Sequence, residues 1–295
     1  MKKAVSAALI MLAACCTVFA SGKADVGFTL STLNNPFFVS MKDGAESKAK
    51  ALGVNLSITD ASDDPAKQVK DIEDLVNKGI KVLIVNPVDS AAVAPTIKDV
   101  IARGIKVIAV DRYVDGVTVD TYIGTDNVLA ANKAGKSFVQ IVGPNAVIAV
   151  LEGVPAASSN IDRMEGYRQA LTAAGLKAAV TQTANYNRAE ALTVTENILQ
   201  SNPNITAILA MNDEMALGAI EAVRAKAKIP GKDILIAGFD AGDDARAAVK
   251  AGEMIYTVEQ KTVLMGETAV ETAKKYINGA QVPANIPIDV EIITK

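Results

Sequence analysis

Short apolar runs recur at a regular spacing along the chain and alternate with amphipathic stretches. This alternation is typical of a parallel sheet covered by helices on both faces. The runs predict strands at residues 26–30, 55–58, 82–86, 107–111 and 122–124 and, in a second series, at 146–151, 179–182, 207–211, 234–239, 255–258 and 289–293.

The second series restarts after Val142-Gly143-Pro144-Asn145. A compact doubly wound domain of this length does not usually hold so many strands. The pattern therefore predicts two similar α/β lobes.

Polar residues follow several of these strands directly. VLIVNP, VIAVDRY, AILAMNDE and ILIAGFDA each run from aliphatic residues into Asn or Asp, at Asn86, Asp111, Asn212 and Asp240. Ligands of open α/β sheets bind outside the carboxyl ends of the strands, so these ends predict a polar cleft between the lobes. A single Asn or Asp after a strand is more often a turn former or a helix N-cap, and we assign Asn86, which precedes Pro87, to that role.

The stretch STLNNPFFVSMKDG, residues 31–44, joins the first strand to a helix. Pro36 suits the first helical position, and it holds Asn35 extended. The apolar positions that follow keep a helical spacing as far as Gly53, which supplies the stop. Two of the six phenylalanines, Phe37 and Phe38, lie at this turn.

Composition narrows the chemistry. The 295 residues are 50% apolar and 21% charged, and the net charge of -3 gives no basic excess for a nucleic-acid partner. There is no His, and the two Cys are Cys15 and Cys16. These absences exclude a thiolate nucleophile in the body, a His base and the usual zinc ligand sets, and we expect no cofactor and no metal.

The N-terminus has the layout of a secretory leader, with Lys2 and Lys3 before an apolar run. Cleavage after Ala20 would make residues 1–20 a signal peptide of an exported, periplasmic protein. A lipobox-like Leu12-Ala13-Ala14-Cys15 offers the alternative of a lipid anchor at Cys15. We favour cleavage after Ala20, because the segment between Cys15 and the first strand is short and partly apolar and would be a poor tether for a lipid anchor.

Candidate binding groups suit a sugar, whose hydroxyls both donate and accept and whose ring faces are apolar. Arg163 follows Ser158, Ser159 and Asn160, any of which could cap a helix, so by itself it is explained as a solvated first-turn cation. The planar polar groups at strand and turn ends are Asn35, Asp111, Arg112, Asn212, Asp240 and Gln260, and the aromatic groups are Phe37, Phe38, Tyr186 and Phe239.

Signals of an enzyme are weak. Gly135-Lys136-Ser137 resembles the end of a phosphate-binding loop, but Ala130 stands where that motif needs Gly. Asp111 or Asp240 could serve as a base, yet no nucleophile, metal set or cofactor loop accompanies them. A sugar-acting enzyme is the remote alternative, and we predict that the protein is not an enzyme.

Seven motifs, in order, resemble the periplasmic ribose-binding proteins of ATP-driven sugar importers: LSTLNNPFF, VNPVDSAAV, VDR, DRMEGY, MNDEMALGA, GFD and VEQ. The resemblance implies the type I periplasmic binding protein fold, in which two doubly wound parallel-sheet lobes are joined by three crossovers. It implies an N-terminal lobe of residues 25–125 plus 261–288 and a C-terminal lobe of 126–260 plus 289–295. A regulator with a DNA-binding head shares this lobe pair, but the leader-like residues before the first strand contain no such head.

The resemblance also implies the ligand and the partners. The expected ligand is a pentose, with D-ribose as the first choice. The alternative is another monosaccharide or a furanose-type signal molecule. The expected partner is the membrane permease of the importer. A chemoreceptor is a further partner left open, and we expect a monomer that binds no nucleic acid. Tyr186 departs from the Phe usual in ribose binders. The implied sugar contacts are Asn35, Phe37, Phe38, Asp111, Arg112, Arg163, Tyr186 at the departing position, Asn212, Phe239, Asp240 and Gln260.

Overall fold

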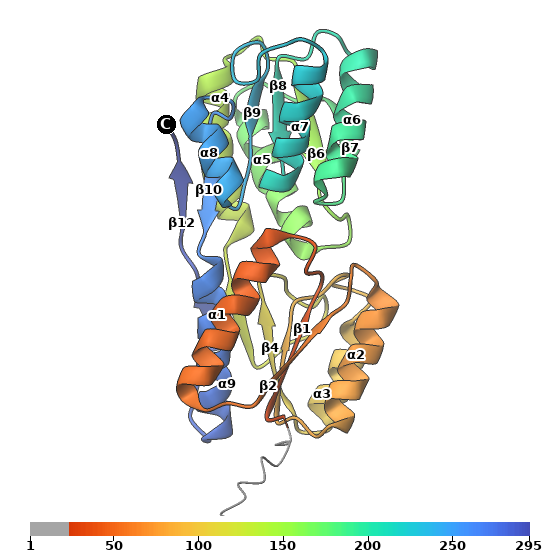
Figure 1. Cartoon of the computed structure of the whole chain (residues 1–295), viewed down its shortest axis with the longest axis vertical. Coiled ribbons are helices and arrows are strands. Elements are labelled where there is room, and N and C mark those ends of the chain that lie inside the picture. The colour runs from red at the N-terminus through yellow and green to blue at the C-terminus, as the bar shows by residue number, and fades with distance from the viewer. Residues whose placement is uncertain (1–23) are drawn as a thin grey trace, which may run out of the picture.

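A computed structural model describes residues 24–295, which form two lobes stacked along the long axis of the molecule (Figure 1). The two hypotheses for the leader, cleavage after Ala20 and a lipid anchor at Cys15, concern residues outside this range. Among the described helices, none has both the length and the apolar character needed to cross a bilayer.

The first lobe, below in Figure 1, contains a six-stranded parallel sheet with the order β11-β5-β4-β3-β1-β2. Every residue of β1 and β3 is buried, as expected for central strands covered by helices on both faces. The strands are β1 (Val26–Leu30), β2 (Leu56–Asp60), β3 (Val82–Val85), β4 (Lys106–Val110), β5 (Thr121–Gly124) and β11 (Asn285–Pro287), and the helices are α1 (Pro36–Leu52), α2 (Pro65–Asn77), α3 (Ala94–Ala102) and α9 (Thr262–Ile277).

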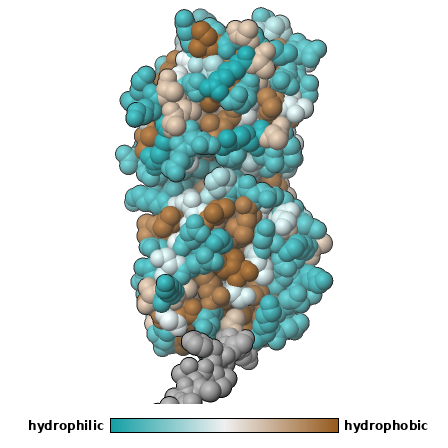
Figure 2. Space-filling model, in the orientation of Figure 1, coloured by the Kyte–Doolittle hydropathy of each residue, from teal (hydrophilic) through white to brown (hydrophobic). Residues whose placement is uncertain are grey.

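The second lobe contains a four-stranded parallel sheet with the order β7-β6-β8-β9, and an antiparallel pair of strands, β10 and β12, beside it. The face in Figure 2 is mostly hydrophilic, and its apolar residues gather mainly on the first lobe beside α1. The strands are β6 (Ile148–Glu152), β7 (Ala178–Thr183), β8 (Ala207–Ala210), β9 (Leu235–Ala237), β10 (Thr257–Gln260) and β12 (Val290–Ile293), and the helices are α4 (Asn127–Val142), α5 (Ser158–Ala173), α6 (Arg188–Ser201), α7 (Asp213–Ala225) and α8 (Asp243–Ala251).

The chain passes between the lobes three times, after β5, after β10 and after β11. The predicted fold class, two doubly wound parallel-sheet lobes joined by three crossovers, is therefore confirmed. The division of the chain at single residues, 25–125 with 261–288 and 126–260 with 289–295, stays a prediction.

Most predicted strands agree with the structure, and the differences have local causes. The strand predicted at 255–258 is wrong by two residues, because Ile255 and Tyr256 run beside β9 before the chain pairs with β12. The strand predicted at 234–239 ends at Ala237, where the backbone turns towards Asp240. The strand predicted at 55–58 continues to Asp60 because its parallel pairing with β1 extends that far. β11 was not predicted, since it has three mostly exposed residues and ends in proline.

Helix α1 begins as the sequence predicts. Asn35 is the N-cap, and its side-chain oxygen accepts a hydrogen bond from the backbone N–H of Phe37 at 2.9 Å. Pro36 occupies the first turn, and Gly53 ends the helix in the left-handed conformation. This cap fixes the direction in which the two phenylalanines leave the backbone.

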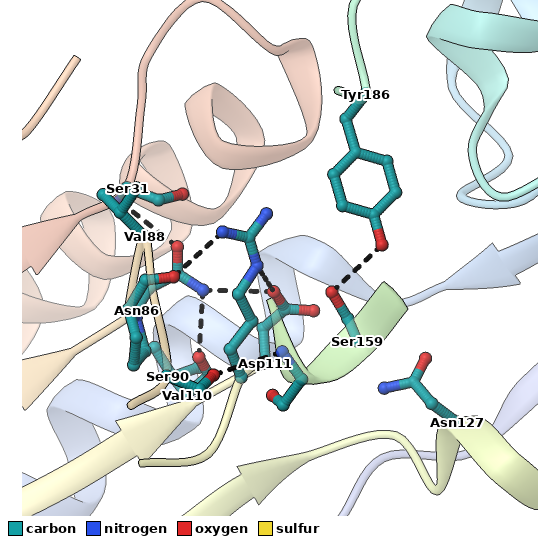
Figure 3. Close-up of polar contacts among 12 residues, drawn as sticks. Ser31, Asn86, Val88, Ser90, Val110, Asp111, Asn127, Ser159 and Tyr186 are labelled. Carbon is teal, nitrogen blue, oxygen red and sulfur yellow. Dashed lines mark hydrogen bonds and ion pairs between the residues drawn. The ribbon is translucent and has the colours of Figure 1, made fainter. Parts of the chain in front are cut away.

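Asn86 is not a simple turn former, and our assignment of it to a capping role is wrong. The side chain is fully buried, and Figure 3 shows its polar contacts at the ends of the strands. Its oxygen accepts from the backbone N–H of Ser31 at 3.2 Å, while its nitrogen donates to the Val110 carbonyl and to the Asp111 carboxylate, both at 3.1 Å. The amide of Gln68 on α2 donates to the Asn86 carbonyl at 2.9 Å and supports it. Asn86 therefore ties the ends of β1, β3 and β4 together.

We predict that Asn86→Ala lowers the free energy of unfolding by about 2 to 4 kcal/mol, because it leaves buried hydrogen-bonding groups without partners. Urea denaturation followed by circular dichroism measures this change. Asn77→Ala, on the exposed end of α2, is the control and should change stability by less than about 0.5 kcal/mol. Equal stability of Asn86→Ala and the control would contradict the bridging role.

Candidate functional site

A small cavity lies between the two lobes, at the carboxyl ends of their parallel strands. Its lining combines charged, amide, hydroxyl and aromatic side chains, so it suits a small polar solute. Each lobe contributes five lining residues: Asn35, Phe37, Phe38, Asp111 and Arg112 from the first, and Ser159, Arg163, Tyr186, Asn212 and Asp240 from the second.

The first lobe presents two phenylalanines and one ion pair to the cavity. Phe37 and Phe38 meet edge to face, with ring centroids 5.0 Å apart. The guanidinium of Arg112 lies 5.2 Å from the Phe38 ring centroid and donates to the Pro87 carbonyl at 2.9 Å. Its Nε lies 3.8 Å from a carboxylate oxygen of Asp111, which comes directly after β4.

The second lobe presents Arg163 from the first turns of α5. Only 3% of this residue is exposed, so the alternative of a solvated first-turn cation is wrong. Its Nε donates to the Asn127 side chain at 2.9 Å and its Nη1 to the Met211 carbonyl at 2.8 Å. Nη1 also lies 3.5 Å from the Asp240 carboxylate. Arg163 thus connects α4, β8 and the loop after β9.

Asn212 combines the two roles weighed for residues at strand ends. It is the N-cap of α7, since its oxygen accepts from the backbone N–H of Met215 at 3.0 Å. Its side chain also lines the cavity. Capping and lining are therefore compatible at this position.

Phe239 and Gln260 lie behind the cavity wall. The guanidinium of Arg163 lies 3.9 Å from the Phe239 ring centroid, so the ring packs against the arginine and helps to hold it in place. Gln260 donates to the Asp240 carboxylate at 2.9 Å and fixes its position. Neither residue is among those that line the cavity.

Ser159 lines the cavity and is absent from the set of candidates predicted above. We considered it only as a helix cap, but the N-cap of α5 is Ala157, and no side chain makes a cap bond there. Ser159 precedes Arg163 by four residues on the same helix and therefore shares its face. That spacing is the signal that could have identified it.

Three cavity residues have left-handed backbones. The φ angles are 63° at Asp111, 60° at Tyr186 and 121° at Asp240, values that residues other than glycine rarely adopt. Hydrogen bonds from the backbone N–H of Asp111 to the Ile123 carbonyl and of Asp240 to the Val258 carbonyl hold two of these turns. Such strained conformations persist where the surroundings fix them, which is common at binding sites.

Burial dominates the electrostatics of the cavity. It raises the pKa of Asp111, although Arg112, Arg163 and the hydrogen bond from Asn86 act in the opposite direction. It raises the pKa of Asp240 further, against the attraction of Arg163. Burial by itself would lower the pKa of Arg163, but the neighbouring acidic groups Tyr186, Asp240 and Asp111 raise it. The cavity therefore holds two carboxylates that gain from any further hydrogen-bond donor.

Direct hydrogen bonds close the two lobes on each other beside the cavity. The backbone N–H of Ser90 donates to the Ala156 carbonyl, and its hydroxyl accepts from the backbone N–H of Ser158, both at 3.1 Å. Tyr113 donates its backbone N–H to the Ser158 hydroxyl at 3.0 Å and its own hydroxyl to Asp162 at 3.3 Å. The described conformation is therefore the closed one.

This set of groups offers a polar neutral solute both hydrogen-bonding partners and apolar surface. The cavity brings acceptors, donors and aromatic faces together without a thiol or an imidazole. Among residues 24–295, no group of three or more His, Cys, Asp or Glu could hold a metal ion.

Comparison with known proteins agrees with this geometry. Residues 26–281 match the family model of the periplasmic binding protein domain. The ribose import binding protein of Haemophilus influenzae is 40% identical over 276 residues, which cover 94% of this chain and 93% of that protein.

Two solved structures are also similar. The Caulobacter myo-inositol binding protein bound to myo-inositol has a TM-score of 0.88 and 37% identity, with 93% of this chain and 94% of that chain covered. A periplasmic solute binding protein of an ABC transporter from Actinobacillus succinogenes with bound D-allose has a TM-score of 0.84 and 32% identity, with 92% and 98% covered. The chain therefore belongs to the periplasmic binding protein family, whose members here are binding proteins and not enzymes.

Proposed function

We propose that the protein is the extracytoplasmic solute-binding component of an ATP-driven sugar importer, and that it captures one monosaccharide, most readily D-ribose, between its lobes. The observation that carries this proposal is the cavity itself, since each lobe supplies an Asp-Arg pair to one shared space. The ribose import binding protein from Haemophilus influenzae supports the choice of sugar. The myo-inositol and D-allose complexes support a polyhydroxylated ring more generally.

A sugar ring fits the chemistry of the cavity. Carboxylates only accept hydrogen bonds and guanidiniums only donate them, so Asp111 with Arg112 and Asp240 with Arg163 can each hold hydroxyls that do both. Asn35 and Asn212 add amide groups that donate and accept. Phe37 and Phe38 offer apolar surface to the C–H groups of the ring. In this proposal Phe239 and Gln260 act by supporting Arg163 and Asp240.

Closure is the step that links capture to transport. Each lobe alone has half of the site, so the ligand binds the closed state best and shifts the population towards it. The membrane permease of the importer then recognises the closed form. In this account the protein is exported to the periplasm and acts as a monomer.

Isothermal titration calorimetry with D-ribose and a panel of other pentoses, hexoses and myo-inositol tests the proposal. We expect one monosaccharide, D-ribose first, to bind at micromolar concentration or tighter. Arg163→Ala or Asp240→Ala should weaken that binding by about 2 to 5 kcal/mol, because each change leaves a buried charge without its partner.

Arg168→Ala is the matched control for the arginine. Arg168 lies on the same helix but is exposed, and its guanidinium pairs with Glu165 at 2.7 Å. Binding weaker than millimolar for every sugar would contradict the proposed function. Unchanged affinity in Arg163→Ala would contradict only its role in the site.

Binding should also depend on pH. Burial raises the pKa of Asp111 and Asp240, whereas a sugar hydroxyl that donates to either carboxylate stabilises the charged form and lowers that pKa again. Sugar binding should therefore release protons, and the affinity should fall as the pH is lowered from neutral towards about 5.

Calorimetry in two buffers of different ionisation enthalpy measures the proton release at each pH. Asp240→Asn cannot titrate at this position and should release fewer protons than the wild type. Proton uptake on binding, or an affinity that rises in acid, would contradict the assigned role of the carboxylates.

A further inference from the structure

Ser159 and Tyr186 form a pair of hydroxyl groups in the cavity wall. The serine oxygen lies 3.3 Å from the tyrosine hydroxyl, and Figure 3 shows the tyrosine ring directing its hydroxyl towards Ser159. Both residues line the cavity, with exposed fractions of 3% for Ser159 and 9% for Tyr186. The mechanism proposed above does not use this pair.

The backbone around Tyr186 is arranged to keep its ring in the cavity. Asn185 and Tyr186 have consecutive left-handed φ angles of 50° and 60°, an unfavourable conformation for an aromatic residue. The ring packs so closely on Gly153 that a Cβ atom at that position would overlap it. The guanidinium of Arg112 lies 5.6 Å from the ring centroid on the first-lobe side. The ring therefore has little freedom to leave this position.

Ser159 reaches the same place from helix α5. It precedes Arg163 by one helical turn, so both side chains project into the cavity from one face of the helix. The serine does not serve as the helix cap, since the N-cap is Ala157. Its hydroxyl meets Tyr186 instead.

A count of hydrogens shows what the pair can offer. Two hydroxyl groups carry two hydrogens, and the bond between them uses one. In the part of the chain that the structure describes, neither hydroxyl has a second protein partner. Burial raises the pKa of Tyr186, which keeps its hydroxyl protonated. One O–H donor and several lone pairs are therefore left for whatever occupies the cavity.

We propose that Ser159 and Tyr186 together determine sugar specificity by hydrogen bonding to one hydroxyl of the bound monosaccharide. This inference rests on the proposed function. The charged groups of the cavity each act in one sense only, because carboxylates accept and guanidiniums donate. The neutral pair does both, as a sugar hydroxyl does, and its mutual bond can run in either direction. The pair therefore favours sugars that carry a hydroxyl at one particular position of the ring.

The test compares Tyr186→Phe, Ser159→Ala and the double variant with the wild type. Tyr276→Phe is the matched control, because it removes a tyrosine hydroxyl that bonds Thr121 at 2.6 Å, at the first residue of β5, and Tyr276 does not line the cavity. The probes are D-ribose and its monodeoxy analogues, one for each hydroxyl position, with binding measured by calorimetry. If the wild type prefers another sugar of the panel, the deoxy series of that sugar is used.

We expect each single variant to bind the parent sugar about three- to tenfold more weakly, in line with the loss of one neutral hydrogen bond. The fold-loss in affinity of the double variant should not exceed the product of the fold-losses of the two single variants, because the two hydroxyls act as a unit. One deoxy analogue should bind the wild type and all three variants with nearly equal affinity. For each protein, we take the ratio of its affinity for the parent sugar to its affinity for the analogue. Both affinities are measured on the same protein, so the ratio does not depend on how much of a variant is folded.

Two results would overturn the inference while the proposed function stands: parent-sugar affinity that is unchanged in both single variants, or an equal loss for every analogue. The second would mean that the pair only shapes the wall. A wild type that binds no monosaccharide at all would overturn the proposed function and this inference together. Tyr276→Phe should behave as the wild type with every probe.

Discussion

The cost of burying charge governs the organisation of this protein. Asp111, Arg112, Arg163 and Asp240 meet in a small cavity between the lobes, where little of each side chain is exposed to water. A buried ion destabilises a fold unless opposite charges and hydrogen bonds compensate it. The pairing of Asp111 with Arg112 at 3.8 Å and of Arg163 with Asp240 at 3.5 Å is loose, so each pair retains capacity for a ligand. In the proposed function, this incomplete pairing is what leaves the four charged groups able to bind a sugar.

The residues behind the cavity wall supply the rest of the compensation. Asn86 holds the Asp111 carboxylate, Asn127 holds the Arg163 guanidinium, and Gln260 holds Asp240. The Phe239 ring lies 3.9 Å from the Arg163 guanidinium and adds a cation–π contact. These groups come from both lobes and from segments far apart in the sequence. The charges are therefore fixed in place before a ligand arrives, which lowers the entropic cost of binding.

The periodic pattern predicts most of this architecture because strands and helices are local. Helix α1 follows from Pro36, from the apolar spacing after it and from Gly53, and strand β1 follows from a short aliphatic run. The carboxyl ends of parallel strands share one edge of their sheet, so Asp111 could be placed at the edge of one lobe, and Asn212 and Asp240 at the facing edge of the other, without coordinates. Arg163 could not, because its local sequence fits a solvated helix turn equally well, and only the resemblance to a family indicated it.

Long-range contacts set the limit of such prediction. Asn86 and Gln68 meet across 18 positions of sequence, and Ser159 and Tyr186 across 27. The left-handed backbones at Asp111 and Asp240 depend on tertiary hydrogen bonds that no local preference indicates. The same contacts distinguish residues that line the cavity from Phe239 and Gln260, which support it.

The central claim is that the two half-sites are completed only when the lobes close around a sugar. Small-angle X-ray scattering of the protein with and without saturating monosaccharide tests this most directly. We predict a larger radius of gyration without sugar, and with sugar a profile that matches the closed conformation described here. Identical profiles in the two conditions, with binding confirmed in the same sample, would contradict the account.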